Sequence, residues 1–413
     1  MADPTSEPIP LDMTGADIQG ELARIRARGP VALVELPGGV PAWSATDADA
    51  LQSLLADPRV SKDPRRHWPA FNNGEITADW PMYTWVAVDS MFTAYGADHR
   101  RLRKLVSPAF THRRTAALRP RIEALVKDLL DALDETPPGE VADLRESFAY
   151  PVPIQVITEL LGVPEHLGPG LRKCVDTYFD TSTGPEDALA NYLEEHRLVS
   201  ELVAYRTEHP GDDITSVLVT TRDEEGSQLT QKELVDTLML IINAGHETTV
   251  NLLDQAIVAL LTHPDQLADA ESGRVSWSEV IEETLRYEAP VAHLPLRYAV
   301  EDIEIGGELI RKGEPILASY AGAGRDPKVH GETADSFDVH RAKKDHLSFG
   351  HGAHHCIGAP LARLEAAIAL PALFERFPEM TFAQDPATLP RIGSFVSNGH
   401  QFLPVHLHGA PEN

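Results

Sequence analysis

Hydrophobic residues recur along most of this chain every three or four positions, the spacing at which they share one face of an α-helix. From this spacing we predict helices that begin near Asp47, Asp98, Thr115, Pro153, Leu171, Asp187, Leu234 and Ser276, and a last one over Ala359 to Phe377. The longest pattern runs from Lys232 to Thr262 and is dense in leucine and isoleucine. It predicts a long helix within the core.

Shorter segments alternate between hydrophobic and polar residues, which is typical of strands. They are Val31–Leu36 and Val40–Trp43 around Gly38-Gly39, Leu296–Ile305 and Leu309–Leu317 around Gly306-Gly307, and a tail from Ile392 to Leu407 that predicts another hairpin. No linker rich in Gly, Ser or charge divides the 413 residues. We therefore predict a mainly α fold, a single large domain over 1–413 with a small β region at about 30–45, 296–320 and 392–407.

The net charge of the chain limits the kinds of molecule that it can bind. The chain has 36 basic and 63 acidic residues, a formal net charge of −27, which argues against nucleic acid and anionic membranes as partners. Its first residues form neither a basic start nor an apolar run, and we find no uninterrupted apolar stretch of about 18 residues. We expect a cytoplasmic monomer that binds no membrane.

One of the two cysteines lies where chemistry is expected. Cys174 has the surroundings of an ordinary packing residue. Cys356 lies in a loop with several glycines, Ser348–Gly358, which leads into the last helix. Gly350, Gly352 and Gly358 allow positive φ and close backbone approach. Free N–H groups near Ile357 and Gly358 favour a thiolate at the start of a helix. A thiolate in such a loop is a candidate axial ligand for haem iron.

Other interpretations of this loop stay open at this point. Cys356 also fits a buried structural cysteine, or a zinc site with His351, His354 and His355, as in a zinc-dependent hydrolase. Covalent haem attachment is excluded because the loop lacks the Cys-x-x-Cys-His pattern.

The long helix carries polar residues near its middle, Asn243-Ala244-Gly245-His246-Glu247-Thr248-Thr249. Ala244 and Thr248 are four apart and share one face, and Gly245 leaves room for a bulky neighbour. A Thr hydroxyl can bond the preceding turn and distort the helix locally. This pattern indicates a groove with an acid beside it, or a kinked core helix whose Glu247 pairs with an arginine.

The cysteine loop resembles the haem-binding signature of the cytochrome P-450 family, Phe-x-x-Gly-x-x-x-Cys-x-Gly, through Phe349, Gly352, Cys356 and Gly358. Further matches follow in the family's order: His99-x-x-x-Arg103, Ala244 to Thr248, Glu283-x-x-Arg286 with a later Arg341, and Arg325-Asp326-Pro327, before which Gly324 replaces the usual Asn. The resemblance covers about residues 30 to 405. It implies the cytochrome P-450 fold and a haem-thiolate monooxygenase.

The resemblance also implies roles for individual residues. Cys356 would ligate the iron of haem b, Thr248 would hydrogen-bond dioxygen, and Glu247 would help to relay protons. Its haem contacts would be His99, Arg103, Arg297 and His354 at the propionates, with Ala244, Phe349 and Gly358. Glu283, Arg286 and Arg341 would form a structural triad.

The family's usual pocket segments give the expected substrate contacts: Met91, Phe92, Phe179, Leu240, Asn243, Ala244, Val291, Leu294, Phe395 and Val396. The same segments also contain Tyr178, His293 and Ser397. This mostly apolar set suits a neutral, bulky molecule, and the resemblance favours C–H hydroxylation of a steroid or macrolide. Asn243 and His293 could orient an oxygen function of the substrate.

With no reductase domain apparent in the sequence, the resemblance implies O2 and electrons from a separate iron-sulfur ferredoxin and its NAD(P)H reductase. An acidic ferredoxin could dock on basic residues that the family places on the proximal side: Arg100, Arg101, Arg103, Lys104, Arg113, Arg114, Arg341, Lys343 and Lys344. That these residues belong to an ordinary surface of mixed charge is an equally supported interpretation. A haem-thiolate protein that senses a ligand or isomerises a substrate is the alternative function.

Overall fold

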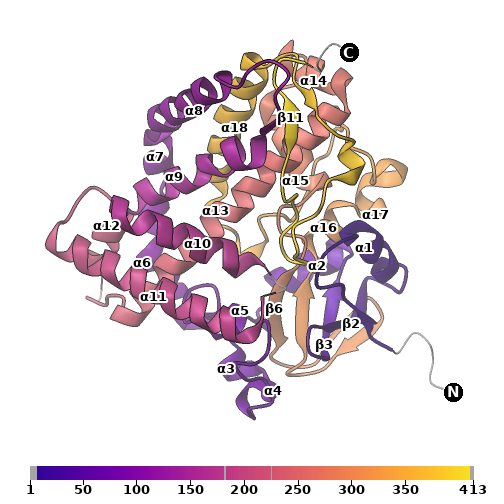
Figure 1. Ribbon diagram of the computed structural model, residues 1–413. Coiled ribbons are helices and arrows are strands. Elements are labelled where there is room, and N and C mark those ends of the chain that lie inside the picture. Colours follow the sequence, from indigo (N-terminus) through magenta and orange to yellow (C-terminus); the bar gives the residue numbers. More distant parts are fainter. Residues whose placement is uncertain (1–6, 181–182, 225, 410–413) are drawn as a thin grey trace.

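The computed structural model describes residues 7–180, 183–224 and 226–409. Helices make up most of it, and the longest, α13 (Gln231–Thr262), runs through the middle of the molecule (Figure 1). A capping box between Thr230 and Glu233 fixes its start. It packs against α9 (Pro151–Leu160), α11 (Pro185–Glu208) and α18 (Ala359–Arg376).

The remaining helices include those that the hydrophobic pattern predicted and several short ones that it did not. They are α1 (Ile18–Arg26), α2 (Ala48–Ala56), α3 (Pro64–His67), α4 (Pro69–Asn72), α5 (Tyr83–Ala87), α6 (Gly96–Val106), α7 (His112–Ala117), α8 (Arg119–Asp134), α10 (Gly168–Phe179), α12 (Ile214–Thr220), α14 (Pro264–Glu271), α15 (Trp277–Tyr287), α16 (Tyr320–Gly324) and α17 (Pro327–His330). The helix predicted from Thr115 is instead two helices, because Pro120 begins a new one in the first turn of α8.

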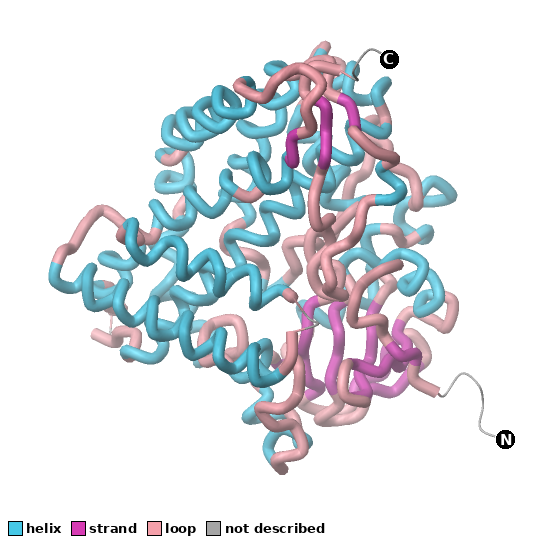
Figure 2. Tube along the Cα trace, in the orientation of Figure 1, coloured by secondary structure: helices cyan, strands magenta, loops and turns pink. Residues whose placement is uncertain are grey.

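The strands gather in two separate places (Figure 2). The larger sheet has the order β1-β2-β3-β9-β6-β4, from β1 (Ile9–Pro10), β2 (Val31–Leu36), β3 (Val40–Ala45), β4 (Val60–Ser61), β6 (Leu294–Ala299) and β9 (Pro315–Ala318). A separate hairpin, β7 (Ile303–Ile305) with β8 (Glu308–Ile310), turns at Gly306-Gly307 as predicted. The mainly α fold with a small β region is thereby confirmed.

The predicted hairpin over 392–407 is wrong in detail. At its start an isolated antiparallel bridge joins Arg391 to His400, and beside it the N–H groups of Ile392 and Gln401 donate to the carbonyls of Gly399 and Pro390. The end of the tail forms β11 (Pro404–His406), which lies between β10 (Thr381–Phe382) and β5 (Ala142–Asp143). Alternation marked the strand correctly but could not identify partners more than 20 or even 200 residues away.

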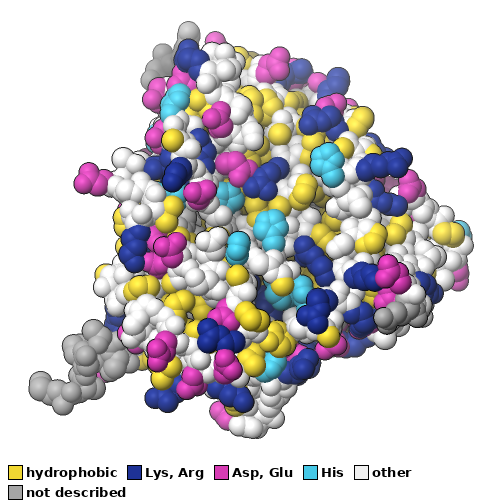
Figure 3. Space-filling view, turned by 180° about the vertical axis from the view of Figure 1, so that it is seen from behind, with side chains coloured by type: hydrophobic (Ala, Val, Ile, Leu, Met, Phe, Trp, Pro, Cys, Tyr) yellow, Lys and Arg dark blue, Asp and Glu magenta, His cyan; other side chains and the backbone are white. Residues whose placement is uncertain are grey.

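The surface carries both signs of charge. Figure 3 shows Lys and Arg interspersed with Asp and Glu over one face, with several histidines near its centre. Within the described ranges, every helix is too short or too polar to span a lipid bilayer.

Candidate active site

The cysteine loop is closed by its own backbone. The N–H of Cys356 donates to the carbonyl of Phe349 at 2.8 Å. Gly350 and Gly352 have φ of 69° and 70°, as expected for residues that a side chain would strain. Gly358 differs from that expectation, because its φ is −83°. A Cβ there would lie 3.8 Å from Sγ of Cys356, so the glycine keeps the space beside the sulfur open.

Several donors and cations lie near the Cys356 sulfur. Burial raises the pKa of its thiol, while the N–H groups of Gly358 and Ala359 and the guanidinium groups of Arg103 and Arg363 oppose that rise. The donors are those of Gly358 and Ala359, one residue later than the expected pair that included Ile357. The exposed surface of Cys356 faces a cavity that it lines. The sulfur is therefore available to a ligand inside the protein.

The zinc alternative is not supported by the positions of the side chains. Among the described residues, no group of three or more His, Cys, Asp or Glu is placed to hold a metal ion. His354 instead stacks near His99, with ring centroids 4.0 Å apart.

The cavity extends from the cysteine loop to the middle of α13 and on to its amino-terminal half. Most residues predicted to contact cofactor or substrate line it: Met91, Phe92, His99, Arg103, Phe179, Leu240, Asn243, Ala244, Thr248, Val291, Leu294, Arg297, Phe349, His354, Cys356, Gly358 and Val396. Residues that the sequence analysis did not select also line it, among them Lys62, Tyr192 and Asp236. The cavity thus joins a sulfur ligand, a cationic region and an apolar wall.

Three buried nitrogen donors at this cavity lack partners. Nζ of Lys62, Nε2 of His99 and Nη1 of Arg297 form no hydrogen bond with any described residue. Burial, and then neighbouring cations, lower the pKa of Lys62 well below its usual value and that of His99 to about 4. Buried donors of this kind need an anion or acceptor. Their clustering fits a ligand with carboxylates, which is what haem presents through its propionates.

Lys62 was missed by the sequence analysis. It follows the edge strand β4, in Val60-Ser61-Lys62-Asp63, where a lysine looks like a solvated surface residue. Only the fold shows that this lysine is buried, with Nζ 3.5 Å from the ring centroid of Phe92. Arg103 also behaves as expected in part, since it lines the cavity, and its Nη2 donates to the carbonyl of His355 at 2.9 Å.

The two residues predicted to take part in proton transfer, Thr248 and Glu247, lie in different surroundings. Thr248 lines the cavity, and its hydroxyl donates to the carbonyl of Ala244 at 2.7 Å. Gly245 makes room as predicted, because a Cβ there would lie 2.8 Å from Cδ1 of Ile157. Glu247 is buried and is not among the residues lining this cavity. It accepts hydrogen bonds from Arg145 at 3.0 Å and from Ser397 at 3.1 Å, the arrangement of a core ion pair.

Three of the residues named for the wall segments, Phe395, His293 and Ser397, do not line the cavity as described, and Ser397 donates to Glu247 instead. Phe395 is fully buried in the core, and His293 bonds Ser319 through Nδ1 at 2.8 Å, so neither lies on the cavity wall as described. Val396 does line it. Phe395 and Val396 lie in a bend in which the Ser394 hydroxyl accepts from the N–H groups of Val396 and Ser397. In this bend Val396 lines the cavity while Phe395 packs into the core.

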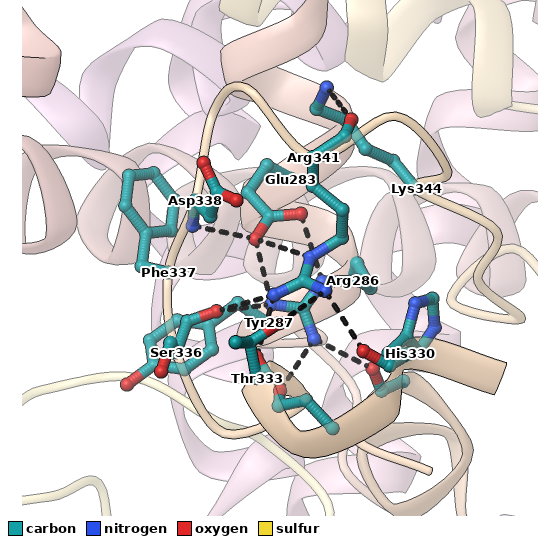
Figure 4. Close-up of polar contacts among 12 residues, drawn as sticks. Glu283, Arg286, Tyr287, His330, Thr333, Ser336, Phe337, Asp338, Arg341 and Lys344 are labelled. Carbon is teal, nitrogen blue, oxygen red and sulfur yellow. Dashed lines mark hydrogen bonds and ion pairs between the residues drawn. The ribbon is translucent and has the colours of Figure 1, made fainter. Parts of the chain in front are cut away.

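The predicted triad of Glu283, Arg286 and Arg341 is present (Figure 4). Nη2 of Arg286 lies 2.7 Å from Oε1 of Glu283, which also accepts from Nε of Arg341 at 3.3 Å. Arg286 further donates to the carbonyls of Gly324, Ala334 and Ser336. The departure at Gly324 has a steric reason here, since a Cβ would lie 2.2 Å from the carbonyl oxygen of Arg286.

Comparison with known proteins agrees with this geometry. A family model for Cytochrome P450 matches residues 170–270 and 277–396. The 2-hydroxy-5-methyl-1-naphthoate 7-hydroxylase of Streptomyces carzinostaticus is 50% identical over 402 residues, which cover 97% of this chain and 98% of that protein.

Solved structures share the whole fold. CYP154A1 from Streptomyces coelicolor A3(2) superposes with a TM-score of 0.92 at 52% identity, covering 97% of this chain and 100% of that one. Testosterone-bound CYP154C4 from Streptomyces sp. ATCC 11861 gives a TM-score of 0.94 at 44% identity, covering 98% of this chain and 100% of that one. The family match, the full-length hydroxylase relative and the shared fold show that this chain belongs to the cytochrome P450 family and is a haem monooxygenase.

Proposed function

We propose that this chain binds haem b through the thiolate of Cys356 and inserts one atom of O2 into a C–H bond of a bulky, mostly apolar substrate. The observation that carries the proposal is the cavity in which the Cys356 sulfur, three unpartnered buried donors and an apolar wall converge. A sulfur ligand next to a carboxylate-binding region matches the iron at the centre of haem and the propionates at its edge.

The residues present fit that cofactor. Cys356 would bind the iron, Lys62, His99, Arg103, Arg297 and His354 would hold the propionates, and Ala244, Phe349 and Gly358 would contact the ring. Bound haem supplies oxygen activation, which thiolate ligation favours. The hydroxyl of Thr248 would turn from the Ala244 carbonyl to donate a hydrogen bond into the cavity. Glu247, whose pKa burial raises against the opposing charge of Arg145, would take part in proton relay behind it.

We propose a steroid or macrolide as the substrate. The wall is largely apolar, with Met91, Phe179, Leu240, Val291 and Leu294 among its residues, and a mostly apolar wall suits such molecules. The testosterone in a structure 44% identical to this chain supports the steroid. The naphthoate named for the 50% identical relative shows that a bicyclic aromatic acid is a competing substrate class.

Electrons would come from an iron-sulfur ferredoxin and its NAD(P)H reductase. Of the basic residues expected to receive it, Arg100 and Arg113 are exposed, whereas Arg101 pairs with Glu233 and Arg114 lies 4.0 Å from Asp212. Arg341 is buried in the triad and is therefore not part of a docking surface. Only some of the expected basic residues thus remain available for an acidic partner.

Turnover with a surrogate ferredoxin and reductase tests the proposal. The reconstituted protein is incubated with NADPH, a panel of steroids and macrolides, and isotopically heavy O2, and products are analysed by mass spectrometry. We expect a hydroxylated steroid or macrolide carrying one heavy oxygen atom. A product whose oxygen comes from water, or no product from any panel member despite haem reduction, contradicts it.

A further inference from the structure

Asn243 places an unpartnered acceptor on the cavity wall. The residue is 6% exposed, lines the cavity, and its Oδ1 accepts no hydrogen bond from the described residues. Its Nδ2 donates to Oε1 of Glu195 at 2.7 Å. Buried amide oxygens normally have a partner. Oδ1 itself has almost no exposed surface, so a donor in the cavity would reach it after a small rotation of the Asn243 side chain.

Glu195 fixes this amide from behind. It belongs to α11, is completely buried, and is not itself on the cavity wall. Its Oε2 has no partner among described atoms, so the bond to Asn243 is the one polar contact recorded for its side chain there. Helix α11 packs on α13, so the pair joins the two helices across the cavity's edge.

A second acceptor lies on the same face of α13. Asp236 precedes Asn243 by seven residues, about two turns or 10 Å along the helix. Its Oδ2 accepts from Nζ of Lys232 at 2.6 Å and from the N–H of Asp89 at 3.1 Å, while Oδ1 lacks a partner in the described structure. Met239 and Leu240 line the wall between the two acceptors. This end of the cavity is an apolar strip bordered by hydrogen-bond acceptors.

Burial, more than any neighbouring charge, determines the charge of Glu195. The titratable groups near it are Tyr178 and Cys174 of α10 and Tyr192 of α11, whose pKa values Glu195 helps to raise, and Asp236 of α13. Burial, with Asp236 adding to it, raises the pKa of Glu195 to about 8, although Asn243 opposes the rise. A carboxyl that is protonated at neutral pH can donate to Asn243 or accept from it. A hydroxyl ligand, which also donates and accepts, matches either orientation of the amide.

We propose that Asn243, positioned by Glu195, determines substrate specificity by hydrogen bonding a neutral hydroxyl group of the substrate. The inference rests on the proposed function and deepens it, because it adds a required polar group to an otherwise apolar substrate. It assigns contact with the substrate to Asn243 and a positioning role to Glu195.

Binding of matched ligands to the haem-loaded protein tests this. Equilibrium dialysis at neutral pH gives Kd for 2-naphthol and 2-methylnaphthalene, which differ by a hydroxyl in place of a methyl group. In Asn243→Leu we expect the preference for the hydroxyl, taken as the ratio of the two Kd values, to fall about five- to tenfold relative to wild type. Comparing ratios cancels the different hydration of the two ligands.

Variants at Glu195 separate positioning from packing. Glu195→Gln keeps a partner for Asn243 and should retain the wild-type ratio, whereas Glu195→Leu should lose it. Asn243→Ala serves in place of Asn243→Leu if the latter fails to take up haem.

An unchanged ratio in the Asn243 variants overturns the inference and means that water satisfies Asn243. Tighter wild-type binding of 2-naphthoate than of 2-naphthol also overturns it, because a carboxylate offers Asn243 no proton. The spectrum of the reduced carbon monoxide complex is recorded on the same samples. A wild-type protein without the thiolate signature refutes the proposed function instead, and the two failures stay distinct.

Discussion

Oε1 of Glu247 lies 3.0 Å from Nη2 of Arg145, a residue 102 positions earlier in the chain. Nη1 of the same guanidinium lies 2.8 Å from Oδ2 of Asp254, whose Oδ1 bonds His400 at 2.6 Å. Arg145 therefore holds two buried carboxylates at once. It also keeps Glu247 away from the cavity, so any proton that Glu247 supplies must pass through a neighbour.

Loss of this arginine should be strongly destabilising. Arg145→Met leaves Glu247 and Asp254 without their shared cation in the core, and we expect a loss of about 3–5 kcal/mol in the free energy of unfolding. Urea denaturation followed by circular dichroism measures it. Arg119→Met breaks a solvent-exposed pair with Glu123 and should cost less than about 1 kcal/mol. Equal effects of the two substitutions would contradict the proposed importance of the buried pair.

Removal of the Thr248 hydroxyl should uncouple electron use from product formation. Thr248→Ala should keep haem and substrate binding, while product per NADPH falls roughly 100-fold, the lower end of the range for one proton-transfer group. Thr262 is the matched control, because its hydroxyl donates to the i−4 carbonyl at 2.7 Å just as that of Thr248 does, but near the helix end. Product per electron that stays at the wild-type value in Thr248→Ala would exclude the role of Thr248 in proton delivery.

Lys62 should contribute to cofactor affinity. Lys62→Met removes a buried donor placed for a carboxylate, and we expect haem to bind about 10- to 100-fold more weakly, as for a charged hydrogen bond of about 1.5–3 kcal/mol. Transfer of haem to excess apomyoglobin measures the rate of loss. Lys127→Met, which removes a lysine from an exposed pair with Asp131, should release haem at the wild-type rate. Wild-type retention in Lys62→Met would show that this lysine does not contact the cofactor.

Glu195 should make stability depend on pH. Its folded-state pKa of about 8 lies above the ordinary value of 4.5, so the folded protein binds more protons than the unfolded chain between these values. Stability from this group is thus fully present below pH 4.5 and is lost as pH rises toward 8. Glu195→Gln should therefore gain stability relative to wild type as pH rises, by about 1–3 kcal/mol at pH 8. A constant difference over that range would disprove the protonated state.

The sequence predicted best what local spacing determines. His99 and Arg103 share a helix face, and His354 lies two residues before Cys356, but the resemblance of these short patterns to the cytochrome P-450 family was needed to assign them to the one cavity that they line. Lys62 and Arg145 could not be found in this way. The ring of Phe92 that covers Lys62 and the carboxylates that pair with Arg145 lie far along the chain, and a single cation in a polar segment looks solvated.

The direction in which a side chain points was harder to predict than the position of its segment in the fold. Of residues 395–397 only Val396 lines the cavity, because the chain bends at Ser394 and leaves Phe395 in the core and Ser397 bonded to Glu247. The sequence of α11, which is mostly polar, gave no indication that Glu195 is buried. Its burial depends on how that helix packs against α13.

The central claim is that Cys356 binds haem iron as a thiolate. The most direct measurement is the visible spectrum of purified protein, reduced and exposed to carbon monoxide, beside that of Cys356→Ser. We predict a strongly red-shifted Soret band in the wild type that is absent from the variant. A wild-type haem spectrum without that shift, or a shift that persists in Cys356→Ser, would contradict the claim.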